Sequence, residues 1–184
     1  MAAAEPESPV VVTTNYYVVR GASPGEIRTS MTEARPWKAS FAFDARTAWE
    51  ARCNYTYRES GGQYLLDSVE VKTKVTVTLP VWSVRMDAEQ DLFERWWEYL
   101  KALSRHEQGH VQYARAATAA VQQRLSALPG FASRHELGVA VHRTVGEVIK
   151  EFRSQEAEYD RQTGHGMTQG AVFLPRSRRN GGPD

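Results

Sequence analysis

Apolar and polar residues alternate over much of the first half of the chain, a pattern typical of β-strands. The longest such stretch is Tyr64–Leu79, where one set of alternate positions is mainly valine and leucine and the other includes Lys72 and Lys74. Because successive side chains of a strand point to opposite faces, we expect one face of this strand to be buried and the other to be in water. The pattern therefore predicts an antiparallel sheet covered on one side, with this strand ending at Pro80.

Three shorter strands and one helix are predicted before this strand. The strands, which are rich in Val, Thr and aromatic residues, cover Val10–Arg20, Trp37–Phe43 and Thr47–Tyr57. A short helix is expected from Pro24 to about Ala34, because Ser23 suits the N-cap and Glu26 the third position of a capping box. The run Ser60-Gly61-Gly62 predicts the turn into the long strand.

The second half of the chain lacks this alternation and is predicted to be helical. Ala88–Leu128 contains no proline and a single glycine, with Asp87 suited to the N-cap and Pro129 to the stop. A straight helix of this length would span roughly 60 Å, whereas a compact domain of this size is only ~40 Å across. We therefore expect a kink or a break near Gly109 or towards Pro129, or a protruding end. A second helix is expected from Ser133 to about Tyr159.

Length and composition are those of an ordinary globular protein. The 184 residues are 41% hydrophobic and 24% charged, which suits one compact domain. We predict a single α+β domain over residues 10–173, between a flexible N-terminus at 1–9 and a flexible tail at 174–184. In this domain an N-terminal, mostly antiparallel sheet with its short helix packs on the two long C-terminal helices.

Charge and cysteine content exclude several classes of function. Lys and Arg number 23 against 22 Asp and Glu, a net charge of +1, which is too balanced to favour binding of nucleic acid or an anionic membrane. No apolar run reaches the ~18 residues of a membrane span, and the first residues lack the features of a signal peptide. Because Cys53 is the single cysteine, any metal must be held by histidine and carboxylate side chains.

One motif indicates specific chemistry: residues 106–110 read His-Glu-Gln-Gly-His inside the long predicted helix. Side chains four residues apart lie on one helix face, so the imidazoles of His106 and His110 can converge on one zinc ion. Glu107 is then placed to act as general base on a metal-bound water. Gly109 costs ~1 kcal/mol in a helix interior relative to alanine, which indicates that something approaches the helix closely there.

A catalytic zinc also needs a third protein ligand. His165 is one candidate, because it lies in a glycine-flanked loop directly after a helix that carries carboxylates. Asp160 and Glu158, near the end of that helix, are the alternatives. His135 and His142, seven residues apart on the second helix, are more typical of ordinary helix residues.

Beyond the motif, the chain resembles the bacterial domain-of-unknown-function 922 family, predicted zinc-dependent proteases, over about Tyr16 to Phe173. The combination of the His-Glu-Gln-Gly-His run with the later Tyr-Asp and Thr-Gly-His-Gly sequences is much more specific than the motif alone. The stretches that carry the resemblance are Tyr17–Gly21, Ala48–Tyr57, Leu79–Trp82, Trp96–His110 and Tyr159–Gly170.

The resemblance has implications for fold, site and location. It implies a zincin-like fold in which His106 and His110 are zinc ligands and Glu107 is the base. It also implies His165 or Asp160 as the third ligand. Members of the family are typically exported, so the resemblance implies a periplasmic or secreted protein.

The aromatic residues around the motif have their own interpretations. Tyr159, next to the candidate ligand loop, is either a phenol that donates to the oxyanion of a tetrahedral intermediate or an aromatic residue that packs at a helix end. The aromatic residues before the motif are interpreted as core, because an aromatic helical stripe is more often packing than a binding site. They are Phe93, Trp96, Trp97 and Tyr99.

The sequence thus predicts a zinc-dependent peptidase. In this prediction His106, His110 and His165 hold Zn²⁺, Glu107 and Tyr159 are catalytic, and the partner is a peptide or protein substrate. Two other functions fit the same residues. One is a metal-stabilised binding or scaffold module without hydrolytic activity, and the other is an amidase acting on a non-protein amide.

Overall fold

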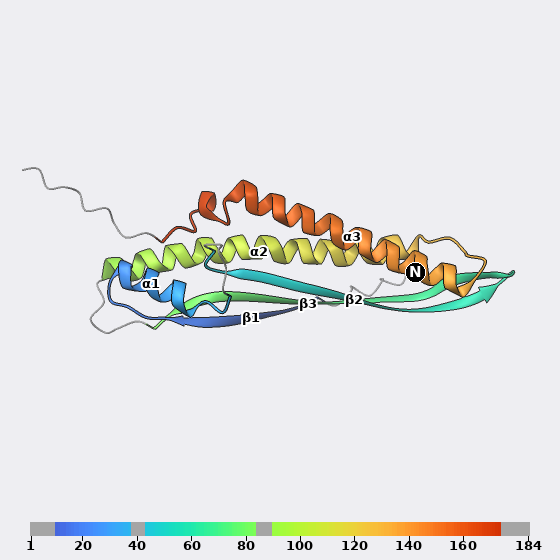
Figure 1. The fold of residues 1–184 in the computed structure, drawn as a ribbon, viewed down its shortest axis with the longest axis horizontal. Helices are drawn as coiled ribbons and strands as arrows, with labels where there is room; N and C mark the ends of the chain where they lie inside the picture. Colours follow the sequence, from blue (N-terminus) through green and yellow to red (C-terminus); the bar gives the residue numbers. More distant parts are fainter. Residues whose placement is uncertain (1–9, 38–42, 84–89, 174–184) are drawn as a thin grey trace, which may run out of the picture. The chain divides into compact units, whose positions relative to one another are not determined.

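A computed structural model describes residues 10–37, 43–83 and 90–173. These residues form the predicted α+β fold, with a three-stranded sheet and three helices, of which the last two are long (Figure 1). A short 3₁₀ helix, η1, follows them. The elements in chain order are β1 (Val10–Val19), α1 (Pro24–Ala34), β2 (Arg46–Ser60), β3 (Gln63–Trp82), α2 (Gln90–Ser126), α3 (Arg134–Thr163) and η1 (Met167–Gln169).

Some predictions fall where the structure gives no description. The flexible ends at 1–9 and 174–184 and the N-cap at Asp87 lie outside the described residues. The same holds for most of the strand candidate Trp37–Phe43, whose two described end residues are not in a strand.

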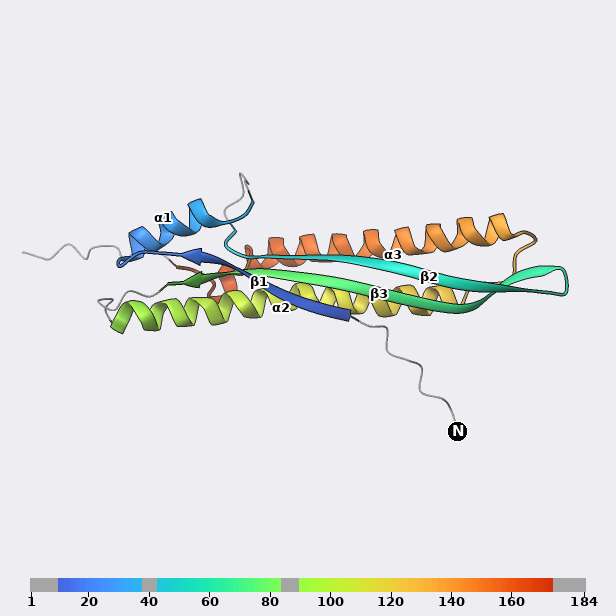
Figure 2. The same cartoon turned by 90° about the horizontal axis from the view of Figure 1, so that it is seen from below.

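The three strands have the order β1-β3-β2. β2 and β3 form an antiparallel hairpin, whose two-residue turn is Gly61-Gly62 with φ values of 59° and 73°, as a type I′ turn requires. β1 instead runs parallel to β3 (Figure 1 and Figure 2), and where both end the Ser83 amide donates to the Val19 carbonyl at 2.8 Å. The sheet is therefore mixed, and the prediction of a mostly antiparallel sheet is corrected. The chain reverses direction through α1 between β1 and β2 and reverses again at the hairpin, so β3 runs in the same direction as β1.

β3 has the predicted alternation of buried and exposed positions. Val71 and Val75 are buried, whereas Lys72 between them is exposed. The strand does not end at Pro80 but continues to Trp82. β3 has 20 residues and β2 has 15, so about five residues of β3 extend past the start of β2, where a proline without an N–H is tolerated.

Capping boxes start both α1, where one was predicted, and α3, whose start near Ser133 was predicted without one. The Ser23 hydroxyl accepts from the Glu26 amide at 3.3 Å, and the Glu26 carboxylate accepts from the Ala22 amide at 2.7 Å. At α3 the Ser133 hydroxyl accepts from the Glu136 amide at 3.2 Å. These side chains satisfy amides that have no partner within the first helical turn, which is why both helices begin where the sequence predicts.

The chain divides into two compact units. Among the described residues, the first unit comprises 10–13, Thr47–Val77 and Gln108–Gln162, and the second comprises Thr14–Arg46, Thr78–Glu107 and 163–173. The division passes through β1, β3 and α2 and falls at the last residue of α3. Each of these elements therefore contributes residues to both units.

α2 is one unbroken helix of 37 residues, so the break near Gly109 that was one of the predicted alternatives does not occur. Its residues up to Glu107 belong to the second unit and those from Gln108 onward to the first. Because α2 contributes residues to both units, the ~40 Å diameter expected of one compact domain does not limit the length of the helix. Among the described residues, no helix combines the length and apolar character needed to cross a bilayer.

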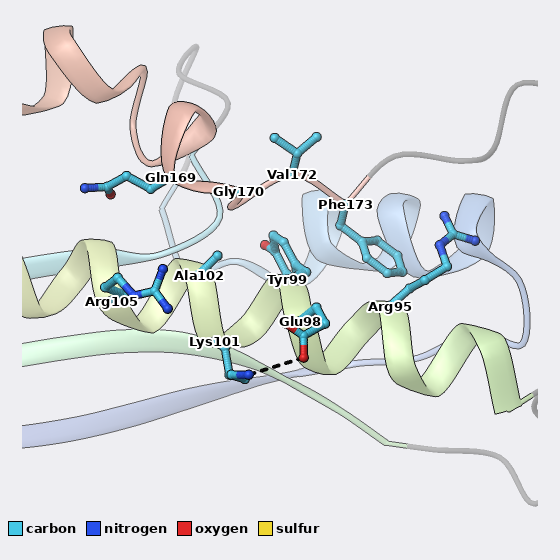
Figure 3. A pocket seen from close by; sticks show the side chains of 10 residues that line it. All are labelled: Arg95, Glu98, Tyr99, Lys101, Ala102, Arg105, Gln169, Gly170, Val172 and Phe173. Carbon is cyan, nitrogen blue, oxygen red and sulfur yellow. Dashed lines mark hydrogen bonds and ion pairs between the residues drawn. The ribbon is translucent and has the colours of Figure 1, made fainter.

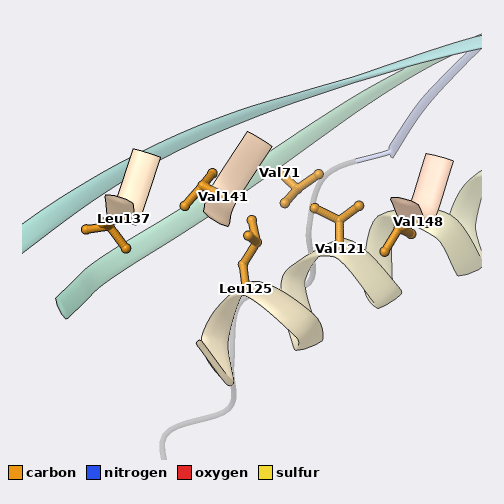
Figure 4. Close-up of a cluster of buried hydrophobic side chains, with 6 residues drawn as sticks. All are labelled: Val71, Val121, Leu125, Leu137, Val141 and Val148. Atoms are coloured by element: carbon orange, nitrogen blue, oxygen red, sulfur yellow. The ribbon is translucent and has the colours of Figure 1, made fainter. Parts of the chain in front are cut away.

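The core of the first unit is built from β3 and the two long helices. On α3 the buried residues Leu137, Val141 and Val148 are spaced by four and seven, so they share one helix face. Fully burying each such side chain contributes roughly 1.5–3 kcal/mol. The buried cluster comprises Val71 of β3, Val121 and Leu125 of α2, and Leu137, Val141 and Val148 of α3 (Figure 4).

The core of the second unit is aromatic. The ring centroid of Trp96 lies 5.4 Å from that of Tyr99 and 5.4 Å from that of Phe173, in tilted and edge-to-face arrangements that aromatic pairs favour. The prediction that Phe93 and Trp97 are also core is wrong, since they are 45% and 54% exposed. They lie one turn apart on a face of α2 that does not include Trp96 and Tyr99.

Candidate metal site

The His-Glu-Gln-Gly-His motif lies within α2, and three of its five side chains are buried. His106, Glu107 and His110 are 2%, 3% and 8% exposed. Because burying imidazoles and a carboxylate without partners is costly, this turn requires polar partners inside the protein. The division between the units falls after Glu107, so His106 belongs to the second unit and His110 to the first.

In the first unit, His110 lies between two carboxylates of α3. Its Nε2 atom is 3.0 Å from Oδ1 of Asp160, and its Nδ1 atom is 3.4 Å from Oε1 of Glu156. Carboxylate oxygens accept hydrogen bonds, so both ring nitrogens of His110 face acceptors, and a metal bound to Nε2 would replace the proton shared with Asp160. Two donors to one tetrahedral zinc lie ~3.3 Å apart, close to the 3.0 Å between His110 Nε2 and Asp160 Oδ1.

Glu156 is itself held by a residue of β2. Both of its carboxylate oxygens accept from the indole Nε1 of Trp49 at 2.9 Å. Arg153 adds an ion pair at 3.2 Å, and its guanidinium carbon lies 4.0 Å from the centroid of the Trp49 ring. Carboxylates that accept from the second nitrogen of a ligand histidine orient the ring and raise its basicity. Glu156 is therefore placed to orient the imidazole ring of His110.

Tyr159 explains the glycine inside the motif. A methyl group at Gly109 would lie 2.4 Å from the Tyr159 hydroxyl oxygen, which is far inside contact distance. The ring of Tyr159 packs edge-to-face on His110, with centroids 5.2 Å apart. Gly109 thus gives a side chain room to approach the helix closely, as its cost in a helix interior predicted.

In the second unit, His106 lies against the segment that follows α3. Its Nδ1 atom is 3.1 Å from Oε1 of Gln169, and the Thr163 hydroxyl is 3.5 Å from the same atom. An amide oxygen only accepts hydrogen bonds, so Nδ1 carries the proton and Nε2 is left to bind a metal. A methyl group at Gly166, which has a φ of 86°, would lie 3.0–3.1 Å from the His106 side chain. The loop therefore packs tightly on this histidine.

These donors form one group that fits a metal ion. Among the described residues, His106, His110 and Asp160 each offer a ligand atom, and these atoms lie within 4.8 Å of one another. Two imidazoles and one carboxylate are a donor set typical of catalytic zinc, with a further position left for a small molecule. The chemistry of the donor set thus fits the predicted zinc ion, with Asp160 in the third place.

The other predicted third ligands lie elsewhere. His165 is exposed, has a φ of 54°, and lies with its ring centroid 5.9 Å from that of Phe43. The carboxylate of Glu158 accepts from Arg161 and Gln162, whose hydrogen bonds lower its pKa to about 2. Neither residue belongs to the group formed by His106, His110 and Asp160.

The two remaining histidines lie on the N-terminal half of α3. His135 and His142 line a hollow in the first unit, together with Tyr55 of β2. They are not members of the candidate metal group formed by His106, His110 and Asp160. Both residues lie on α3, as the sequence predicts.

Two residues near the histidines were missed by sequence reasoning. Glu156 lies four residues before Asp160, so helical spacing alone places both on one face of α3. This four-residue spacing is the sequence signal that could have identified Glu156 as a neighbour of Asp160. Gln169 follows two glycines and has no periodic relation to His106, so its contact depends on the fold of the loop.

Comparison with known proteins identifies the family to which the chain is similar. Residues 14–166 match the family model described as "Bacterial protein of unknown function (DUF922)". A search of curated proteins found no match, and neither did a search of solved structures. The matched range includes His106, Glu107, His110 and Asp160, whereas Gln169 lies beyond it.

Proposed function

The chain belongs to the DUF922 family of bacterial proteins of unknown function, and from this premise we propose that it is a zinc-dependent peptidase with a zincin-like site. One observation carries the proposal. His106, His110 and Asp160 form a group of potential metal donors, and the buried Glu107 directly follows the first of them in the motif.

The three donors would hold the zinc ion. His106 and His110 contribute Nε2, because Gln169 and Glu156 engage the other nitrogen of each ring. Asp160 contributes a carboxylate oxygen. The chemistry that zinc supplies in such a site is Lewis-acid activation of a carbonyl group and of a water molecule.

Glu107 serves as the general base and then as the general acid. Its carboxylate accepts a proton from the attacking water and delivers that proton to the nitrogen of the leaving amine. The location of Glu107 supports this role, since it follows His106 directly and is 3% exposed. A carboxylate in such surroundings is shielded from bulk water, which strengthens its interactions with the reacting atoms.

Tyr159 serves as a donor to the substrate. Its hydroxyl lies against the backbone of α2 at Gly109, between the two histidines of the motif. From there the phenol donates a hydrogen bond to the carbonyl oxygen as negative charge develops on it. The edge-to-face contact with His110 positions the ring for this role.

The proposal is tested by metal content and cleavage together. The purified chain is expected to contain zinc and to cleave casein or a peptide library, and a chelator should abolish the cleavage. Glu107→Gln should retain zinc and lose cleavage, typically 10²–10⁴-fold for a general base. Glu158→Gln is the matched control, because it changes an exposed carboxylate outside the metal-binding group.

Other outcomes identify the competing functions. Stoichiometric zinc without cleavage of any peptide or amide supports a metal-stabilised binding module. Cleavage restricted to non-protein amides supports an amidase. A chain that remains free of metal in the presence of zinc contradicts the proposal altogether.

A further inference from the structure

The second unit contains a pocket lined in part by Gln169, the residue in contact with His106. One wall is α2 between Arg95 and Arg105, and the other is the segment 169–173 after α3 (Figure 3). The cavity volume is about 470 Å³, within the range of small-molecule and peptide side-chain sites. We propose that this pocket, termed the Arg105 pocket, binds a carboxylate group of the peptide substrate.

The pocket is joined to the candidate metal site through one side chain. Gln169 lines the pocket, and its Oε1 atom is 3.1 Å from Nδ1 of His106. In Figure 3, Gln169 and Arg105 lie at the same end of the pocket, and Arg95 lies at the other. Because Gln169 contacts a candidate zinc ligand, an extended peptide bound at the candidate metal site would place a neighbouring side chain or its C-terminus at this end of the pocket.

The charges of the pocket favour an anion. Its lining includes three cationic side chains, Arg95, Lys101 and Arg105, and one carboxylate, that of Glu98. Lys101 is paired with Glu98 at 3.2 Å. Arg95 is 3.8 Å from Asp91 and lies over the ring of Phe173, with its guanidinium carbon 5.9 Å from the centroid.

Arg105 is the cationic side chain of the pocket that is placed to bind an anionic ligand. It is exposed and forms no ion pair with any residue in the described part of the chain. Its guanidinium offers a planar pair of N–H donors, which matches the geometry of a carboxylate. The apolar surface of Phe173 and Val172 lines the remainder of the pocket and would cover the aliphatic part of an acidic side chain.

The inference rests on the proposed function and deepens it by naming a substrate class. The ligand is a carboxylate, which a peptide provides either as an Asp or Glu side chain or as its C-terminus. Both sources fit the same guanidinium, so the experiment separates them.

Binding is measured by fluorescence polarisation to the zinc-loaded full chain carrying Glu107→Gln, so that no cleavage occurs. Three labelled peptides of otherwise identical sequence serve as probes. The first has a central Glu and an amidated C-terminus, the second has Gln and a free C-terminus, and the third has Gln and an amide. One of the first two is expected to bind about tenfold more tightly than the third, the size of effect expected for a hydrogen bond to a charged group.

Adding Arg105→Gln should remove that tenfold preference. Arg115→Gln is the matched control, because Arg115 is an exposed α2 residue that does not line the pocket. Circular dichroism and zinc content verify that both variants are folded. Equal binding of the three peptides, or a preference that survives Arg105→Gln, overturns the inference.

Failure of this inference is distinguishable from failure of the proposed function. If the unmodified chain cleaves peptides without any preference for a carboxylate, the enzyme proposal stands and the Arg105 pocket is wrong. If the carboxylate peptide binds through Arg105 but no peptide is cleaved, the pocket stands and the enzyme proposal fails.

Discussion

The indole nitrogen of Trp49 donates to the carboxylate of Glu156, 2.9 Å from each oxygen, across 107 residues of sequence. The same carboxylate lies 3.4 Å from Nδ1 of His110. A residue of β2 thus holds a residue of α3, which in turn orients a histidine of α2. The sheet therefore supports the candidate metal site without supplying one of its donors.

This relationship predicts that Glu156 determines zinc affinity. Glu156→Gln should lower the affinity about 10–100-fold, as the loss of a partner to a ligand histidine usually does. Trp49→Phe should lower it in the same direction, because the carboxylate loses its indole donor. Competition with a chromophoric chelator measures both effects. Glu151→Gln is the control, since Glu151 pairs with Arg124 on the surface, and equal zinc affinity in all variants would contradict the prediction.

The third ligand can be identified by zinc stoichiometry. Asp160→Asn should lose stoichiometric zinc, because it removes the anionic donor 3.0 Å from His110. His165→Ala and Glu158→Gln should keep zinc, since neither residue belongs to the donor group. Atomic emission on dialysed protein gives the result. Zinc retained in Asp160→Asn and lost in His165→Ala would reinstate His165 as the ligand.

Gly109 and Gly146 make a matched pair for testing the close approach of Tyr159. Gly109→Ala should destabilise the protein by about 1–3 kcal/mol, because the new methyl group meets the Tyr159 ring and overpacking costs this much. Gly146→Ala, in α3, has open space around it and should stabilise the protein by about 0.5–1 kcal/mol through helix propensity. Denaturant unfolding compares them. A stabilised Gly109→Ala protein would show that Tyr159 does not lie where the site requires it.

Two buried tyrosines of the second unit lead us to expect that the free energy of unfolding decreases at alkaline pH. The hydroxyl of Tyr17 donates to the Asp44 carbonyl at 2.6 Å, and that of Tyr99 donates to the Asp44 carboxylate at 2.8 Å. Burial first, and then the negative charge of Asp44, raise the pKa of both phenols above the ordinary value of about 10. The unfolded state releases these protons at lower pH than the folded state does.

Because both pKa values are raised on folding, their contribution to stability is complete below pH ~10 and is lost as the pH rises further. The free energy of unfolding, measured in urea at increasing pH, should therefore fall above pH ~10. Tyr17→Phe combined with Tyr99→Phe should reduce that slope, although it also removes two hydrogen bonds. A slope unchanged in the double variant would show that other groups cause the alkaline loss.

The sequence by itself determined the features that depend on near neighbours. The capping residues Ser23 and Ser133 set the starts of α1 and α3, and the spacing of Val71 and Val75 indicated the buried face of β3. The spacing of His106 and His110 placed both rings on one helix face. In each case the physical cause acts within one helical turn or along one strand, so periodicity alone reveals it.

Only the tertiary structure decided the features that depend on how distant segments pack. It placed β1 parallel to β3, exposed Phe93 and Trp97, and brought Asp160 rather than His165 beside His110. It also recruited Glu156 and Gln169 to the two ring nitrogens that the metal would leave unused. Periodicity shows which residues share a face, whereas the partner of that face depends on contacts between residues far apart in the sequence, such as His110 and Asp160, which are 50 positions apart.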